Sequence, residues 1–198
     1  YEKSYIIPRE ESICIFNIYN TINHNKNFHI IGDSHTAVFN GLNSIQPKYP
    51  DLNNMDSIPY IKTYRINAGT SYNSQARAIP IIDSILETID NRDYLVFCYG
   101  EVDCRAHLIK QFNLQVNRNK IEIIEECVDK IIQTILHFKN RNLNVIAYGP
   151  PPTFRDENQN RVPVTRWYGN HYERNHTTKI FNDFYKEKFK SNNIKMFT

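Results

Sequence analysis

Three short stretches carry residues that could act together in acyl-transfer chemistry. They are Gly32-Asp33-Ser34, an isolated Gly69, and Gly100-x-x-Asp103. A serine hydroxyl becomes a nucleophile when a base is available, and nearby backbone N–H groups can stabilise the charge on a carbonyl oxygen. The residue types also allow a simpler interpretation, in which Ser34 or Asp33 only caps a following helix and Gly69 is an ordinary turn residue.

Each stretch follows an apolar segment that is typical of a strand. The predicted strands cover residues 12–19, 28–31, 60–68, 94–99, 144–147 and 193–197. Apolar residues recur at helical spacing over 71–89, 119–138 and 177–189, and a short helix is expected over 36–42. We expect Gly32 to permit a sharp turn, and Pro80 to start or kink the helix in which it lies. Alternating strands and helices predict an α/β fold, a parallel sheet with helices on both faces.

The position of the three stretches follows from that fold. In a parallel sheet the carboxyl ends of the strands lie at one edge, so the loops that follow them converge there. We therefore expect Ser34, Gly69 and Asp103 to lie close together. The domain is expected to span residues 28–198, with residues 1–27 forming an N-terminal strand and turn packed on it.

The composition argues against several classes of protein. The chain has 198 residues, a net charge of +3 and no dense run of basic residues, which argues against a nucleic-acid partner. No apolar stretch is long enough for a membrane span. The four cysteines form no C-x-x-C pair, Cys98 and Cys127 are expected to be buried thiols, and a cytoplasmic location is the simplest expectation. Because residue 1 is Tyr1 and not methionine, we expect the chain to be a domain of a larger protein.

The three stretches resemble the first sequence blocks of the SGNH/GDSL hydrolases, which are serine esterases and acyltransferases. The variant GDSH…GEVDCR…YGPPP is similar to a subgroup met beside polysaccharide-building genes. The resemblance implies a three-layer α/β/α sandwich with a flavodoxin-like sheet. It also implies that Ser34 is the nucleophile, supported by Asp33, and that the N–H groups of Ser34 and Gly69 are oxyanion donors. No cofactor or metal is implied.

The sequence departs from the family at two positions. Where the family places an oxyanion-donating asparagine, this chain has Val102. Arg105, held by Asp103 or Glu101, is the nearest replacement. Arg105 and Asp103 could instead hold an anionic substrate group, or form a structural ion pair or loop anchor.

The family's D-x-x-H motif, which supplies the base, is absent. We expect the base beyond Thr198, with His171 and His176 as alternatives.

His35 is a poor candidate for that base. It directly follows Ser34 in sequence, and adjacent side chains do not face each other on a helix.

Aromatic and basic residues gather in the loop over residues 161–176. Trp167, Tyr168 and His171 suit stacking on a sugar ring, although a partner surface or a lid packed on the core is an alternative. The sequence therefore predicts an O-acetyl esterase or O-acetyltransferase acting on a carbohydrate, in the second case with an acyl donor such as acetyl-CoA. The alternative is a catalytically degenerate module that binds a glycan or a partner. A flavin or redox protein is disfavoured because no phosphate-binding loop is present.

Overall fold

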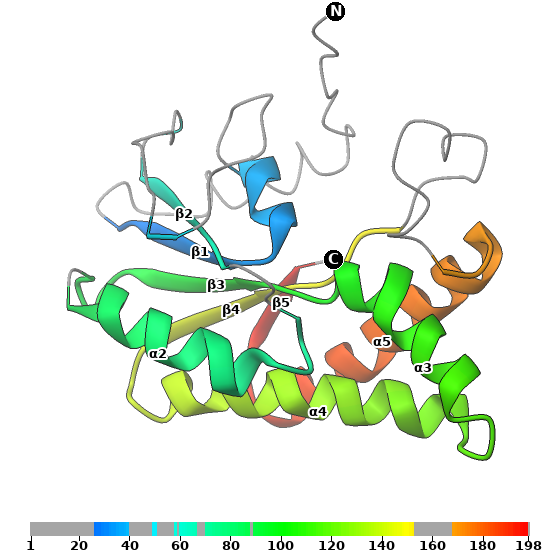
Figure 1. Cartoon of the computed structure of the whole chain (residues 1–198). Helices are drawn as coiled ribbons and strands as arrows, with labels where there is room; N and C mark the ends of the chain where they lie inside the picture. The colour runs from blue at the N-terminus through cyan, green and yellow to red at the C-terminus, as the bar shows by residue number, and fades with distance from the viewer. Residues whose placement is uncertain are drawn as a thin grey trace, which may run out of the picture.

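The fold is a five-stranded parallel sheet with helices packed on it (Figure 1). The computed structural model describes residues 26–39, 49–50, 58, 60–66, 70–87, 89–152 and 168–197. The strand order is β2-β1-β3-β4-β5, which is the flavodoxin-like order of a doubly wound sheet. The strands are β1 (Phe28–Gly32), β2 (Ile61–Arg65), β3 (Tyr94–Cys98), β4 (Asn144–Tyr148) and β5 (Lys195–Phe197).

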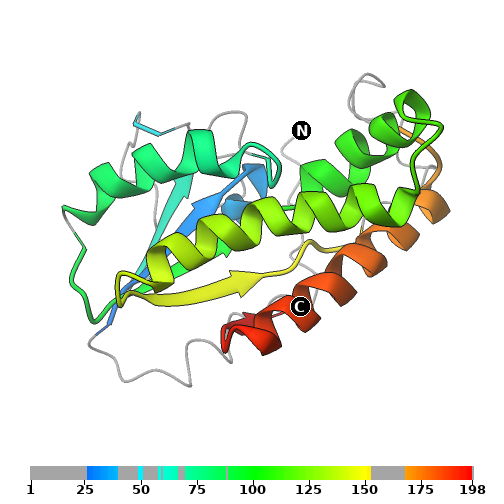
Figure 2. The same ribbon diagram turned by 90° about the horizontal axis from the view of Figure 1, so that it is seen from below.

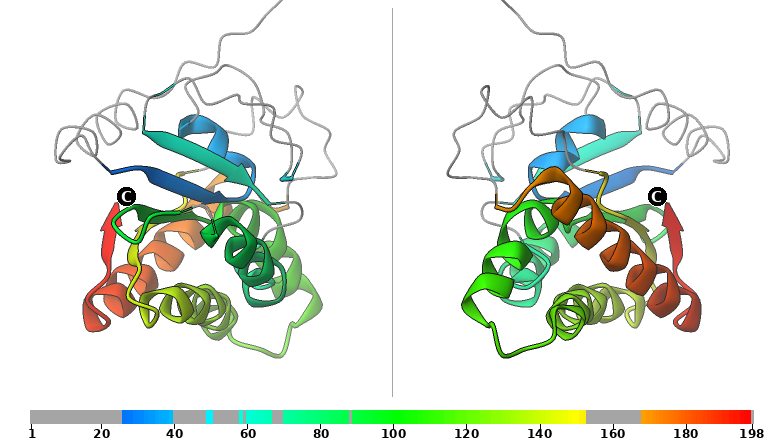
Figure 3. Two further views of the ribbon diagram at one scale, coloured as in Figure 1. Left: turned by 90° about the vertical axis from the view of Figure 1, so that its left-hand side faces the viewer. Right: turned by 90° about the vertical axis from the view of Figure 1, so that its right-hand side faces the viewer.

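Helical segments occupy both sides of this sheet, which confirms the predicted α/β/α layers. Three long helices lie side by side on one face (Figure 2). The 3-10 helix η1 lies on the other (Figure 3). None of the helices within the described ranges is both long and apolar enough to cross a membrane. In chain order the helical segments are η1 (Ser34–Phe39), α2 (Ser74–Leu86), the π-helical turn η2 (Asp103–His107), α3 (Leu108–Leu114), α4 (Lys120–Lys139) and α5 (His171–Ser191).

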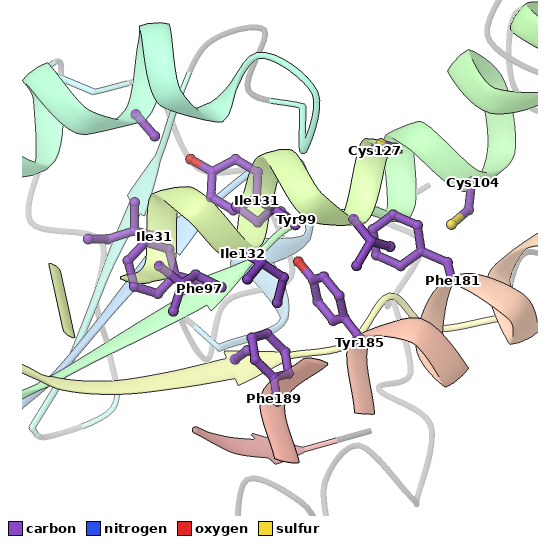
Figure 4. Packing of buried hydrophobic residues seen from close by; sticks show 14 of the residues in the cluster. Ile31, Phe97, Tyr99, Cys104, Cys127, Ile131, Ile132, Phe181, Tyr185 and Phe189 are labelled. Carbon is purple, nitrogen blue, oxygen red and sulfur yellow. The ribbon is translucent and has the colours of Figure 1, made fainter. Parts of the chain in front are cut away.

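Side chains of the central strands alternate between two apolar cores, as the two-residue period of a strand requires. Leu95 and Phe97 of β3 point to the core under the long helices, whereas Val96 and Cys98 point to the core under η1. The first core is dense with aromatic rings from α5, among them Tyr185 (Figure 4). Cys98, Cys104 and Cys127 are buried, as expected for Cys98 and Cys127.

Several element boundaries differ from those predicted. The helix expected over 36–42 is a 3-10 helix that already begins at Ser34. Pro80 neither starts nor ends α2 and lies inside it on the exposed side, where a carbonyl that loses its helical partner can bind water. α5 begins six residues before the predicted start at 177, because Asn170 and Glu173 form a reciprocal capping box. The strand predicted over 12–19 lies outside the described residues.

Gly32 is required for close strand packing. A Cβ atom built at this position would lie 1.8 Å from the carbonyl oxygen of Cys98, a backbone atom of the adjacent strand β3. The turn after β1 does not use a left-handed conformation at Gly32, since the positive φ angles among the described glycines belong to Gly100 and Gly169. The structure thus explains this glycine by the close approach of a neighbouring strand, which leaves no room for a side chain.

We expect Gly32→Ala to destabilise the protein by about 3 kcal/mol or more, because backbone atoms cannot rotate away as a side chain can. Urea unfolding followed by circular dichroism measures this difference. Equal unfolding midpoints for the two proteins would show that β1 and β3 separate here without cost.

A buried polar cluster lies at the edge of the sheet where the parallel strands begin. The ring of His29 is buried, with its Nε2 3.1 Å from a carboxylate oxygen of Asp93 and its Nδ1 3.1 Å from the hydroxyl of Tyr64. Asp93 also accepts hydrogen bonds from the backbone and side chain of Asn27. These bonds fasten the start of β1 to the start of β3, away from the edge that carries Ser34.

Candidate active site

Ser34 lies at the topological switch point of the sheet. In the order β2-β1-β3-β4-β5, the strand that follows β1 in the chain is β2, on one side of the β1–β3 pair. The strand that follows β3 is β4, on the other side of this pair. Ligands of open α/β sheets bind in the crevice between the carboxyl ends of two such strands. Ser34 follows β1, and Glu101 and Asp103 follow β3, so the structure brings these residues to the same edge of the sheet.

The capping role at η1 belongs to Asp33 and leaves Ser34 available. A carboxylate oxygen of Asp33 accepts the backbone N–H of His35 at 2.8 Å, and its carbonyl oxygen accepts the Thr36 hydroxyl at 3.0 Å. Asp33 is almost fully buried, whereas Ser34 is partly exposed. Within the described part of the chain, no group is hydrogen-bonded to the Ser34 hydroxyl. The local structure thus separates a buried capping carboxylate from an accessible hydroxyl.

Charged side chains form a compact network beside Ser34. The Nε of Arg105 donates to both carboxylate oxygens of Glu101, at 2.8 and 2.9 Å. The Nδ1 of His35 lies 3.3 Å from Oε2 of Glu101 and 3.4 Å from Oδ1 of Asp33. Glu101 and Asp33 are buried, while the His35 side chain is 27% exposed. Two carboxylates and two cationic groups therefore meet where the connections after β1 and β3 begin.

This network favours the charged form of His35. Burial opposes the charge, but the nearby carboxylates of Asp33 and Glu101 outweigh it and raise the pKa of His35 to about 8, against a smaller opposing effect of Arg105. The folded protein therefore binds this proton more tightly than the unfolded chain does. The resulting stabilisation is complete below pH 6.5, the ordinary value, and is lost as the pH rises through about 8.

Asp103 ties the connection after β2 to the segment after β3. Its buried carboxylate accepts the backbone N–H of Ser71 at 2.7 Å. This bond ties the residues just before α2 to η2. Burial raises the pKa of Asp103 to about 7, hydrogen bonding to Ser71 works against it, and the charges of Asp33 and Glu101 add to it. This bond makes Asp103 a loop anchor, one of the interpretations of this residue from sequence, and its role in binding substrate stays a prediction.

The π-helical turn η2 carries both Asp103 and Arg105 close to the edge of the sheet. Such turns are rare and often mark functional sites, because an extra residue in the turn re-aims the side chains around it. Arg105 pairs with Glu101 four residues earlier, as the i,i+4 spacing allows. Of the two partners considered for Arg105, Glu101 and Asp103, the structure shows an ion pair with Glu101.

Only part of the predicted sugar-binding loop lies in the described ranges. The backbone N–H of Tyr168 donates to the carbonyl oxygen of Arg105 at 3.2 Å, which joins this loop to η2. The Tyr168 ring is partly exposed and lies 6.0 Å from the Nζ of Lys110. His171 begins α5 and packs against the exposed ring of Tyr172. His176 is exposed on α5, and Gly69 and Trp167 lie outside the described residues.

Two residues of the network were not predicted as members of the active site. Glu101 was considered from sequence only as a residue that could hold Arg105, four positions away, a spacing typical of an ion pair on a helix. His35 was considered only as a base for its neighbour Ser34. Its contact with Glu101 joins positions 66 residues apart and is visible only in the folded chain. Within the described ranges, no group of three His, Cys, Asp or Glu side chains is placed to hold a metal ion.

Comparison with known proteins shows the fold. No protein-family model and no curated protein sequence matches this chain. Among solved structures, a catalytic mutant of an acetylxylan esterase from Geobacillus stearothermophilus superimposes with a TM-score of 0.51 and 16% identity, covering 89% of this chain and 77% of the other. A phospholipase A1 from Streptomyces albidoflavus has a TM-score of 0.49 and 12% identity, with 86% and 78% covered. The chain thus has an α/β/α fold that is also used by an esterase.

Proposed function

We propose that this protein is a serine-dependent O-acyl esterase or O-acyltransferase that acts on acetylated carbohydrate. The observation that carries the proposal is the placement of Ser34: a partly exposed hydroxyl at the switch point of the sheet, relieved of the capping role by Asp33 and bordered by the Arg105–Glu101–His35 network. The fold shared with an acetylxylan esterase supports an acetyl ester of a polysaccharide as the substrate class.

The proposed reaction has two steps. The Ser34 oxygen gives up its proton to a base and forms a bond to the acyl carbon. The bond between that carbon and the substrate oxygen then breaks, and the alcohol leaves with the proton returned from the base. Water then releases the acyl group in an esterase, or a second sugar hydroxyl takes it in a transferase. The oxyanion formed in each step needs donors, and positive charge from Arg105 compensates for the hydrocarbon side chain of Val102.

Acetate release tests this function directly. The full natural protein is incubated with O-acetylated xylo-oligosaccharides, and acetate is quantified with and without an acceptor sugar. Free acetate identifies an esterase, and acetylated acceptor identifies a transferase. Glycan binding without turnover by the folded full chain would contradict the proposal and identify the degenerate binding module considered from sequence.

A further inference from the structure

We propose that Glu101 is a positioning residue that holds the two cationic side chains next to Ser34 and sets the pH range in which they act together. This inference rests on the proposed function for its catalytic consequence, although its structural content does not depend on that function. It assigns to Glu101 a role that the resemblance does not provide, since the family blocks leave this position unspecified.

The geometry of Glu101 is that of a shared acceptor. One carboxylate receives the Nε of Arg105 at 2.8 and 2.9 Å on its two oxygens, and the second oxygen also lies 3.3 Å from Nδ1 of His35. The Glu101 side chain is 7% exposed, so water screens these contacts poorly. A buried carboxylate in such a position fixes its partners more firmly than an exposed surface pair would.

The consequence for His35 follows from the groups that face it. These groups are the carboxylates of Asp33 and Glu101, which favour the imidazolium, and the guanidinium of Arg105, which opposes it. Among the described residues, removing Glu101 leaves the carboxylate of Asp33 to compensate for burial and for the charge of Arg105. His35 then loses its proton at a lower pH, and its own positive charge disappears from the neutral range.

The consequence for Arg105 is geometric. Its Nε is the atom fastened to Glu101, so the orientation of the planar guanidinium is set from that side. Without the carboxylate, Arg105 keeps its charge and loses this constraint. A donor that is no longer preorganised stabilises an oxyanion less well, which lowers kcat more than it raises KM.

Histidine titration by NMR and steady-state kinetics test the proposal on the full natural chain. For the wild type we expect His35 to titrate near pH 8, and for Glu101→Gln near or below its ordinary value of 6.5. The same variant should lose roughly tenfold in kcat at pH 8 with little change in KM, and its activity should decline at lower pH than that of the wild type. Glu101→Asp, which keeps the carboxylate, should restore part of both properties.

Glu126→Gln is the matched control, because it removes a glutamate carboxylate from an exposed pair with Arg118 and should leave the His35 titration and kcat unchanged. A wild-type His35 that titrates at or below pH 6.5, or a folded Glu101→Gln protein in which it still titrates near pH 8, would overturn the proposal. The titration of His35 in the wild type tests the proposal even when Glu101→Gln does not fold. If the wild type lacks ester turnover, the proposed function fails, and the titration still tests the Glu101 contact.

Discussion

Ser34→Ala is expected to reduce kcat for acetyl-ester hydrolysis by about 10⁴-fold or more, because no other group in the site replaces the attacking oxygen. The fold should be retained. Asp33 provides the cap at η1, and within the described residues the Ser34 hydroxyl contributes no hydrogen bond that the substitution would remove. We therefore expect the free energy of unfolding to change by less than about 0.5 kcal/mol.

Active-site labelling gives the second readout for this variant. A fluorophosphonate probe should modify the wild type at Ser34, identified by mass spectrometry of the labelled peptide, and should not modify Ser34→Ala. Ser84→Ala is a suitable control, since that serine is exposed on α2 and distant in sequence from the three candidate stretches. Undiminished turnover by folded Ser34→Ala would reject Ser34 as the nucleophile.

Arg105→Ala is expected to lower kcat by about 100- to 1,000-fold and to change KM little. The physical reason is that a developing oxyanion in a poorly hydrated site needs preorganised donors, and removing one donor from such a site costs about 3 to 4 kcal/mol of transition-state stabilisation. Val102 provides no side-chain donor, whereas Arg105 carries a permanent charge and is oriented by Glu101. Arg105→Lys keeps the charge but not the planar fork, and should recover part of the loss.

Steady-state kinetics separates the roles that Arg105 could have. An increase in KM with unchanged kcat would assign it to binding an anionic group of the substrate. Unchanged values of both constants would make it a structural anchor for η2 and Tyr168. Arg118→Ala is the control, because it removes an arginine from an exposed ion pair with Glu126 and should affect neither constant.

Secondary structure and strand direction could be predicted from sequence because each depends on a local pattern. The continuous apolar run of residues 94–99 indicated a strand buried on both faces, and β3 is such a strand. The apolar spacing over 119–138 indicated a long helix, and α4 begins after an Asn119 cap at this position. Alternation of these elements then required a parallel sheet, so the chain order of the candidate loops was enough to place Ser34 and Asp103 at one edge.

Local patterns were less informative where the ends of elements depend on neighbours in space. Gly32 could be recognised as important, but its reason is the approach of the Cys98 carbonyl from another strand, which no local pattern contains. The start of α5 at His171 was missed because the capping box of Asn170 and Glu173 lies in a polar stretch without apolar periodicity.

The residues of the candidate site also fall into two groups, those identified from sequence and those whose contacts only the folded chain shows. By itself the sequence determined the nucleophile candidate, the missing side-chain donor at Val102 and the availability of Arg105, since these are matters of residue type and spacing. Only the tertiary structure decided how the charges pair. His35 and Glu101 are far apart in the chain, and they meet because β1 and β3 are adjacent in the sheet and end in register, with Gly32 opposite Cys98. Burial of Glu101 between Arg105 and His35 then strengthens electrostatic contacts that would be weak in water.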